Sequence, residues 1–198
     1  IMMIKYVFIV VAYLVGSIPF SIVIGRLFKG VDVRDHGSGN PGGTNALRHL
    51  GKKVGLLIVF FDVMKGGWII LIVKLGLIDE STLFPVLLYG VVAAIGHVYS
   101  IFIGFKGGKA VATSAGMVIF YNPLMALGLA VIFFTVLKTT KFVSLASSSA
   151  AVGLVVAALI FDWTLLPYAI FLCALVLYRH KTNFKNLLNK VEPKITWI

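Results

Sequence analysis

The sequence predicts an all-α membrane protein, and three features indicate that class: composition, the length of the apolar segments and the distribution of the cations. Hydrophobic residues make up 60% of the 198-residue chain and charged residues only 13%. This is too apolar for a soluble domain of this size. We expect one polytopic helical domain over residues 1–198, with about seven transmembrane helices.

Seven apolar segments approach the roughly 20 residues that a helix needs to cross the hydrocarbon core. They cover residues 3–27, 54–77, 83–103, 110–122, 124–137, 142–161 and 163–178. The first is longer than a signal-peptide core and lacks a convincing small-residue cleavage site, so we interpret it as a retained span. The short fourth and fifth segments flank Asn122 and Pro123. A helical hairpin is favoured there, because a single crossing would not keep Lys138, Lys141 and the basic tail all on the cytoplasmic side. How deeply this hairpin enters the bilayer stays open.

The cations lie at helix ends and predict the orientation of the chain. If the loop 28–53 is cytoplasmic and the chain then alternates, 15 of the 18 lysines and arginines fall on the cytoplasmic side. The opposite connections carry Asp79, Glu80, Asn122 and Asp162 but no lysine or arginine. This is the positive-inside pattern, with the N-terminus outside and the C-terminus inside. It accounts for the net charge of +11 without a nucleic-acid partner.

The tail after Arg179 differs from the apolar segments. Its apolar residues follow i, i+3, i+4, i+7 spacing with lysines among them, at Phe184, Leu187, Leu188 and Val191. This pattern predicts a short basic amphipathic helix on the membrane surface, with membrane lipid as its partner.

Two glycine-rich polar runs, at residues 36–48 and 104–116, interrupt the apolar chain. Glycine lets the backbone turn through positive φ and bring successive N–H groups onto one anion. We expect the two runs to hold two phosphate groups at the membrane surface, although which run binds which phosphate stays open. The candidate residues are Gly37, Ser38, Gly39, Asn40, Gly42, Thr44, Asn45 and Arg48 in the first run and Gly104, Lys106, Gly107, Gly108 and Lys109 in the second.

Named nucleotide and metal motifs do not account for these runs. Residues 37–42 fit G-x-G-x-x-G, but no strand precedes them and a proline sits within the turn. The G-G-K of 107–109 lacks the remaining features of a Walker loop. No two histidines have the spacing of a metal pair on one helix. We therefore predict neither a metal nor a cofactor.

Several polar residues inside the apolar segments are further candidates, because such residues are costly to place in a bilayer. Asp62 and Lys65 are three residues apart and share a helix face, and a structural ion pair is favoured over direct catalysis. His97 is a candidate substrate ligand, with a structural hydrogen-bonding role as the alternative. Ser144 lies one turn from Lys141 at a predicted cytoplasmic helix end.

Three segments resemble the motifs of the bacterial acyl-phosphate:glycerol-3-phosphate acyltransferases, the PlsY family. They are G-S-G-N-P-G-G-T-N-A-L-R at 37–48, G-H-V-Y-S-I-F-I-G-F-K-G-G-K-A-V-A-T at 96–113 and R-H-K-T-N-F-K-N-L-L-N-K-V-E at 179–192. G-S-I-P-F at 16–20 and K-F-V-S-L-A-S at 141–147 extend the similarity. The chain departs from the family pattern at Gly43, Ser100, Ala110 and Lys190, where alanine, proline, glycine and glycine are expected.

The resemblance implies transfer of a fatty acyl group from acyl phosphate to the 1-hydroxyl of sn-glycerol 3-phosphate, the first acylation of phospholipid biosynthesis. It implies a bacterial inner-membrane enzyme with its site facing the cytoplasm, no acyl-enzyme intermediate, and the soluble enzyme that makes acyl phosphate as a candidate partner. The resemblance also implies that the loop 104–109 holds the phosphate of glycerol 3-phosphate. The catalytic residues are expected to be Ser38, Arg48, Lys109, His180 and Asn183. The substrate-binding residues then include, besides the glycine-rich runs, His97, Ser100, Lys141, Ser144 and Glu192.

Two other classes remain as alternatives. A phosphate transporter would also need cationic glycine loops and intramembrane charge, but it should carry inverted repeats, which the sequence does not display. A structural membrane protein would need no polar loops of this kind.

Overall fold

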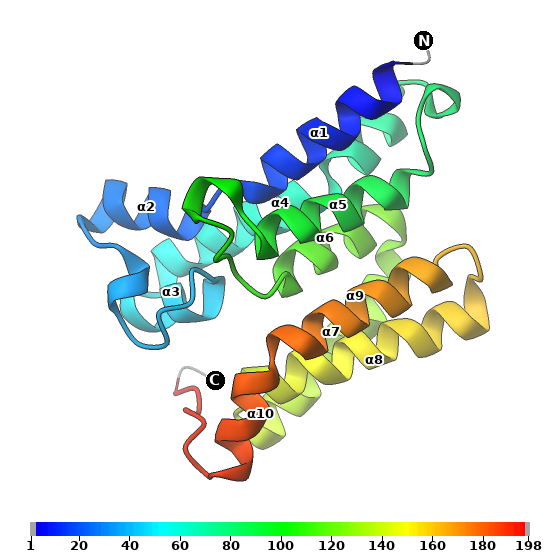
Figure 1. Ribbon diagram of the computed structural model, residues 1–198. Coiled ribbons are helices and arrows are strands. Elements are labelled where there is room, and N and C mark those ends of the chain that lie inside the picture. The colour runs from blue at the N-terminus through cyan, green and yellow to red at the C-terminus, as the bar shows by residue number, and fades with distance from the viewer. Residues whose placement is uncertain (1–2, 197–198) are drawn as a thin grey trace. The chain divides into compact units, whose positions relative to one another are not determined.

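A computed structural model describes residues 3–196, and this part of the chain contains ten α-helices and three short 3₁₀-helices but no strand (Figure 1). The predicted all-α class is confirmed. The chain divides after Tyr121 into two compact units, which we call unit 1 and unit 2 and describe separately. The single domain expected over the whole chain stays a prediction.

Unit 1 is a bundle in which α4 packs chiefly on α6, and α1 packs on α5. Figure 1 shows α1, α4, α5 and α6 running side by side, with α2, α3 and the glycine-rich loops near one end. Its elements are α1 (Ile4–Ser17), α2 (Phe20–Lys29), η1 (Val33–Asp35), α3 (Gly43–His49), α4 (Lys52–Lys74), η2 (Glu80–Thr82), α5 (Val86–Val98), η3 (Ile101–Ile103) and α6 (Val111–Tyr121).

Glycines let these helices approach until backbone meets backbone. A Cβ built on Gly66 of α4 would lie 1.8 Å from the carbonyl oxygen of Thr113 on α6, and one on Gly116 would lie 1.9 Å from that of Val63. At the α1–α5 crossing, a Cβ on Gly16 would lie 2.2 Å from the carbonyl oxygen of Ala93. Membrane helices associate through such small-residue contacts because lipid provides little hydrophobic drive between them.

Unit 2 consists of α7 (Pro123–Thr140), α8 (Val143–Phe161), α9 (Leu166–Arg179) and α10 (Lys181–Leu188), with α8 packed on both α7 and α9. Asn122 caps α7, because its Oδ1 accepts a hydrogen bond from the N–H of Met125 at 3.0 Å, and Pro123 occupies the first turn, where its missing N–H costs nothing. Only Leu137 of the 18 residues of α7 is buried. Nearly all of this helix therefore lies at the surface of unit 2.

The predicted tail helix forms but is shorter than the spacing indicated. Helix α10 ends at Leu188, and Val191 lies beyond it. The N–H of Val191 bonds the carbonyl of Asn186 at 2.9 Å and that of Lys190 bonds Leu187 at 3.1 Å, which is the pattern of a Schellman motif. The chain then returns to the α7–α8 connection, where the N–H of Ile195 donates to the carbonyl of Lys141 at 2.9 Å.

Within residues 3–196, four helical segments are long and apolar enough to cross a bilayer: α4, the α5–η3 segment Val86–Ile103, α7 and α8. A fifth results if α1 and α2, which are bent by 43° at the break between them, count as one span. Helices α6 and α9 have only 11 and 14 residues. The predicted segments coincide with these helices to within a few residues, whereas the count of seven and the orientation stay predictions. Helix α3, inside the first glycine-rich run, is not among the predicted elements.

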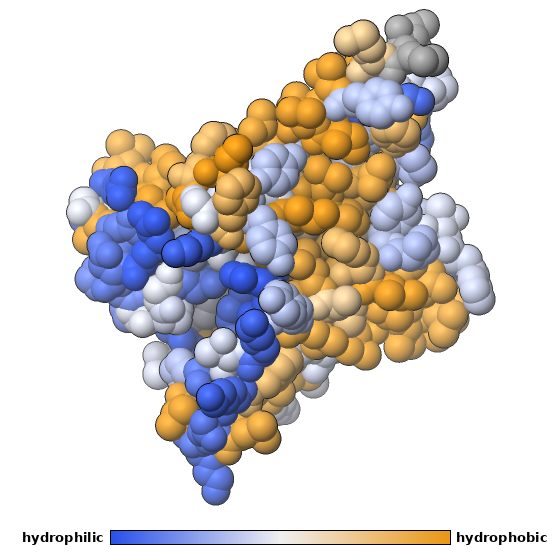
Figure 2. All heavy atoms as spheres, viewed as in Figure 1, coloured by the Kyte–Doolittle hydropathy of each residue, from blue (hydrophilic) through white to orange (hydrophobic). Residues whose placement is uncertain are grey.

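The surface of each unit separates apolar from polar regions (Figure 2). In unit 1 the face shown is hydrophobic along α1 and hydrophilic over α3 and the adjoining loops. In unit 2 it is hydrophobic over α8 and hydrophilic around α10. Exposed apolar surface of this extent marks contact with a membrane or a partner.

Candidate active site

The first element of the site is the break between α1 and α2. Pro19 has no N–H to donate, so the helix cannot continue through it, and the backbone of Ser17 and Ile18 is left without regular helical bonds. The Ile18 carbonyl accepts from the N–H of Phe20 at 3.1 Å, and two side chains complete the bonding. Ser100 Oγ donates to the Ser17 carbonyl at 2.5 Å, and Lys65 Nζ donates to the Ile18 carbonyl at 3.0 Å.

Asp62 and Lys65 form the predicted ion pair within α4. Lys65 Nζ lies 2.8 Å from Asp62 Oδ1, and the two side chains are only 2% and 3% exposed. His97 Nδ1 lies 3.7 Å from the same carboxylate oxygen. The pair therefore belongs to a larger buried polar cluster that joins α4, α5 and the α1–α2 break.

The second glycine-rich run folds back on the end of α5. The N–H of Gly107 donates to the carbonyl of Val98 at 2.9 Å, and the N–H of Gly108 donates to that of His97 at 3.0 Å. A Cβ on Gly107 would lie 2.0 Å from the His97 carbonyl oxygen, so only glycine allows this approach. Lys106 is exposed and Lys109 is half-buried where the run leads into α6.

Asn45 organises the first glycine-rich run. Its buried side chain donates from Nδ2 to the carbonyls of Val33 at 2.9 Å and His36 at 3.0 Å. Its Oδ1 accepts from the N–H of Ser38 at 3.4 Å, and Ser38 Oγ accepts from the N–H of Asn40 at 3.4 Å. The exposed Ser38 is thus presented on a loop whose backbone is fixed from within.

The cations that precede this run serve a different purpose. Asp32 Oδ2 accepts from both Arg26 and Arg34 at 2.8 Å, and the Arg34 side chain also bonds Oδ1 at 3.0 Å. The hydrogen bonds from Arg34, with a smaller contribution from Arg26, hold the pKa of Asp32 well below its usual range. These two arginines therefore stabilise the connection after α2, and neither is among the predicted phosphate ligands.

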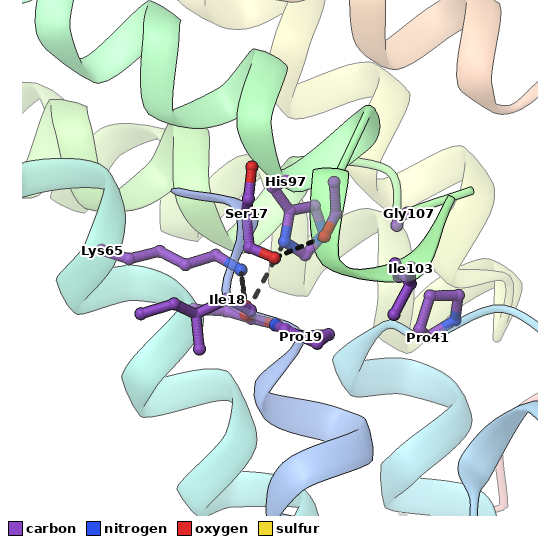
Figure 3. A pocket seen from close by; sticks show the side chains of 11 residues that line it. Ser17, Ile18, Pro19, Pro41, Lys65, His97, Ile103 and Gly107 are labelled. Carbon is purple, nitrogen blue, oxygen red and sulfur yellow. Dashed lines mark hydrogen bonds and ion pairs between the residues drawn. The ribbon is translucent and has the colours of Figure 1, made fainter. Parts of the chain in front are cut away.

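These elements meet at one small pocket that is partly open to solvent; its empty volume, with the open solvent included, is about 190 Å³ (Figure 3). Pro41 comes from the first glycine-rich run, Gly107 and Gly108 from the second, and Pro19 from the helix break. In Figure 3 the Lys65 side chain reaches across from α4 toward Ile18, with His97 close to Ser17. The two runs, far apart in sequence, thus lie at a common site within unit 1. Its lining residues are Ser17, Ile18, Pro19, Pro41, Asp62, Lys65, His97, Ser100, Ile103, Gly107 and Gly108.

Unit 2 gathers the predicted residues of the third motif. Glu192 Oε1 accepts from Asn183 Nδ2 at 2.7 Å and from Ser144 Oγ at 3.0 Å. Buried His180 stands at the α9–α10 junction, with Nδ1 2.8 Å from the Val176 carbonyl oxygen. Lys141 adopts a left-handed conformation at the end of α7, with φ of 64°. These residues come from the end of α7, from α8, from the α9–α10 junction, from α10 and from the tail. Their roles in the site stay predictions.

Comparison with known proteins identifies the family. A family model described as "Glycerol-3-phosphate acyltransferase" matches residues 6–190. The chain belongs to the glycerol-3-phosphate acyltransferase family. It is an acyltransferase of phospholipid synthesis and an integral membrane protein with several apolar helices.

Curated relatives carry the same description over nearly their whole length. A glycerol-3-phosphate acyltransferase of Bacillus cytotoxicus is 47% identical over 194 residues, which are 98% of this chain and 96% of the relative. That of Bacillus subtilis is 45% identical over 191 residues, covering 96% and 97% of the two chains.

Two solved structures of a family member share the fold. PlsY (YgiH), an integral membrane glycerol 3-phosphate acyltransferase, matches in its glycerol 3-phosphate form with a TM-score of 0.87 and 38% identity, over 97% of this chain and 96% of that one. Its lysophosphatidic acid form matches with a TM-score of 0.85 and 37% identity, over 97% and 95%. The resemblance inferred from the sequence motifs is confirmed.

The four departures from the acyltransferase pattern have different structural settings. A Cβ on Gly43 would lie 2.5 Å from Val59 Cγ2, so glycine leaves room for that side chain. Ser100 supplies the hydroxyl that bonds the Ser17 carbonyl, which proline would lack. Ala110 and Lys190 have positive φ, of 59° and 58°. At these two positions an L-residue adopts the conformation that glycine prefers.

We therefore expect Lys190→Gly to stabilise the acyltransferase by about 0.5–1 kcal/mol, because glycine removes the left-handed strain at the C-terminal position of the Schellman motif. Thermal unfolding of the detergent-solubilised protein measures the change. Lys185→Gly is the matched control, since Lys185 lies inside α10 and a helix-interior glycine costs about 1 kcal/mol. Destabilisation by both substitutions would show that Lys190 carries no strain.

The sequence did not assign the helix break or the pocket wall to the site. Ser17, Pro19 and Pro41 line the pocket but were not among the candidates. Proline within an apolar segment was the available signal, because it breaks the helix and exposes polar backbone where only protein or water can satisfy it.

Proposed function

We propose that this acyltransferase transfers a fatty acyl group from acyl phosphate to the 1-hydroxyl of glycerol 3-phosphate, releasing 1-acylglycerol 3-phosphate and inorganic phosphate. The observation that carries the proposal is the meeting of two glycine-rich, cation-bearing runs at one pocket of unit 1. The family member solved in glycerol 3-phosphate and lysophosphatidic acid forms supports the choice of acceptor and product. Both the donor and the acceptor carry a phosphate, and two phosphate-binding runs match that requirement.

Acyl phosphate suits a site without an obvious nucleophile. It is a mixed anhydride, so its carbonyl is already activated, and positioning with charge neutralisation can supply much of the acceleration. In the proposed step the glycerol 1-oxygen forms a bond to the carbonyl carbon while the bond from that carbon to the phosphate oxygen breaks. The departing phosphate takes the hydroxyl proton. No acyl-enzyme forms.

Residues of unit 1 receive separate roles in this proposal. Arg48 and Lys109 neutralise phosphate charge, because the guanidinium offers two parallel donors and the ammonium a compact point charge. Lys106, the exposed cation of the second run, assists them. Ser38 contacts substrate through its hydroxyl. Asn45 acts indirectly, because its amide donors are already engaged with the backbone of the loop that presents Ser38.

The remaining glycines and polar residues of the runs shape the phosphate sites. Gly37 and Gly39 have φ of 58° and 67°, and Gly104 has φ of 63°, conformations that glycine adopts without strain. The N–H groups of Gly39, Gly107 and Gly108 donate to carbonyls of the protein, so these three glycines act through the shape of the loops. We assign to this group Gly37, Gly39, Asn40, Gly42, Thr44, Gly104, Gly107 and Gly108.

In unit 2 we assign substrate contact to His180, Asn183 and Lys141. Glu192 holds Asn183 and Ser144 through one carboxylate oxygen. Glu192 Oε2 is buried and has no hydrogen-bond partner among the described residues. A buried acceptor of this kind is costly unless a bound group satisfies it, which favours a ligand beside this cluster.

The charge distribution supports a site on the cytoplasmic side of the bacterial inner membrane. Both glycine-rich runs and the basic tail then share the side that the positive-inside rule assigns to the cytoplasm. The soluble enzyme that makes acyl phosphate would have access to the donor there, and the acyl chain would stay in lipid.

The donor is tested with purified protein in lipid, supplied with glycerol 3-phosphate and either acyl phosphate, acyl-CoA or acyl carrier protein. The proposal expects inorganic phosphate and 1-acylglycerol 3-phosphate in equal amounts, with acyl phosphate alone as donor. Turnover with acyl-CoA in the absence of acyl phosphate would overturn the donor assignment. Uptake of glycerol 3-phosphate into sealed vesicles without acylation would favour a transporter.

Arg48→Ala is expected to lower kcat/KM by about 100-fold to 1,000-fold, because it removes a charged donor aimed at a phosphate. Arg48→Lys keeps the charge but loses the two-pronged geometry, so an intermediate loss is expected. Steady-state release of phosphate measures both. Lys53→Ala, which removes an exposed cation from the start of α4, should leave kcat/KM nearly unchanged. Equal losses in the Arg48 and Lys53 variants would point to a general effect of charge.

A further inference from the structure

We propose that Asp62 and His97 are positioning residues that fix the second glycine-rich run, and with it Lys109, for binding of glycerol 3-phosphate. The inference rests on the acyl transfer proposed above. It assigns these two residues neither proton transfer nor direct contact with the reacting carbonyl.

His97 meets the loop through both its backbone and its ring. Its carbonyl accepts from the N–H of Gly108 at 3.0 Å, and the next carbonyl, of Val98, accepts from Gly107 at 2.9 Å. A Cβ built on Gly108 would lie 2.1 Å from His97 Nε2, so the ring packs directly against the glycine backbone. The residue after Gly108 is Lys109. A displacement of the His97 ring therefore moves the backbone that carries this cation.

Asp62 faces the other side of the same ring. Asp62 Oδ1 lies 3.7 Å from His97 Nδ1 and 2.8 Å from Lys65 Nζ. Lys65 Nζ also donates to the Ile18 carbonyl at 3.0 Å and lies 5.6 Å from the Phe20 ring centroid. The carboxylate is therefore anchored to α4 and to the helix break, and the ring is held between this anchor and Gly108.

The backbone of the second glycine-rich run needs the support of these contacts to stay ordered. It contains Gly104 and Phe105 with positive φ of 63° and 61°, and it ends at Ala110 with φ of 59°. Glycine-rich backbone loses more conformational entropy on ordering than other backbone. A loop that is ordered before the ligand arrives does not incur that loss on binding. The support that Asp62 and His97 give to this run should therefore raise its affinity for the phosphate that it binds.

The test compares His97→Ala, His97→Asn and Asp62→Asn in the acyl phosphate assay. His97→Ala should raise KM for glycerol 3-phosphate by about tenfold or more and change KM for acyl phosphate little, because only one phosphate site loses its support. His97→Asn keeps a polar group at the Nδ1 position but lacks the ring atoms that pack against Gly108, so it should recover only part of the loss. Asp62→Asn should also raise KM for glycerol 3-phosphate, but by less than His97→Ala does.

A second measurement reports on the loop itself. Hydrogen–deuterium exchange over residues 104–110 should become faster in His97→Ala and Asp62→Asn, while exchange over residues 36–45 stays unchanged. Lys74→Met is the control, because Lys74 also lies on α4 and donates to a backbone carbonyl, that of Tyr121 at 2.8 Å, and it does not line the pocket. It should leave both KM values and the exchange unchanged.

The outcomes separate the inference from the function on which it rests. If the unaltered protein releases no phosphate from acyl phosphate, the donor assignment is wrong. The exchange measurement still tests whether Asp62 and His97 order residues 104–110. The inference is overturned if His97→Ala lowers kcat with KM unchanged and His97→Asn does not restore it, since that pattern indicates proton transfer. Unchanged kinetics or unchanged exchange in His97→Ala would overturn it as well.

Discussion

Lys65→Met is expected to lower the free energy of unfolding by about 3–5 kcal/mol, the largest loss among the polar substitutions considered. The change removes the cation that lies 2.8 Å from Asp62 and the donor that satisfies the Ile18 carbonyl. The Asp62 side chain is only 3% exposed. It would remain as an uncompensated buried carboxylate inside a bilayer-spanning helix, which is costly.

The double variant Asp62→Asn with Lys65→Met tests whether the pair is structural. Removing both charges eliminates the isolated carboxylate, so much of the lost stability should return. Thermal unfolding in one detergent–lipid mixture measures all variants. Lys74→Met, on the same helix but bonded to an exposed site, should cost far less. A double variant no more stable than Lys65→Met alone would show that charge compensation is not what holds the cluster together.

Gly66→Ala is expected to destabilise the protein by about 3 kcal/mol, because a single methyl group forces α4 and α6 apart. The added Cβ would lie 1.8 Å from the Thr113 carbonyl oxygen and 2.7 Å from its carbonyl carbon. These are backbone atoms, so no rotamer change can relieve the overlap. The contact between α4 and α6 is the most extensive in unit 1. The pocket residues Asp62 and Lys65 lie on α4, so activity should fall together with stability.

Gly128→Ala provides the matched control for Gly66→Ala. Gly128 lies in α7, and a Cβ built there meets nothing within 4 Å. The same substitution should be neutral or stabilise by up to about 1 kcal/mol, because alanine favours the helix. The midpoints of thermal unfolding of the two variants give the comparison. Similar midpoints for both would show that the α4–α6 crossing tolerates a wider separation.

The sequence predicted the helical elements well because hydrocarbon length constrains them. Segment 142–161 corresponds to α8 at Val143–Phe161, and 124–137 lies within α7. Apolar length and flanking cations are local properties of the chain, so they can be read without tertiary information. The break at Pro19 was missed because the segment was interpreted by its apolar length and not by its proline. Helix α3 was missed because its glycine and polar residues have low helix propensity.

The candidate site was predictable where residue type alone indicates anion binding. Glycines and cations marked both runs, and the pocket brings Pro41 of the first run to Gly107 of the second. The connection of His97 to Asp62 and Gly108 was not predictable, because it depends on the crossing of α4 and α5. The engagement of Asn45 with the carbonyls of Val33 and His36 likewise depends on how the loop closes.

Helix α7 spans about 27 Å at 1.5 Å per residue, and it buries only Leu137. We expect acyl chains to cover its exposed apolar side chains in a bilayer, and so to solvate α7 as water solvates the outer helix of a cytosolic enzyme. A bilayer thinner or thicker than this helix makes α7 tilt or deforms the surrounding lipid. The lipid is thus a component of the native fold, and a melting temperature for this enzyme describes protein and amphiphile together.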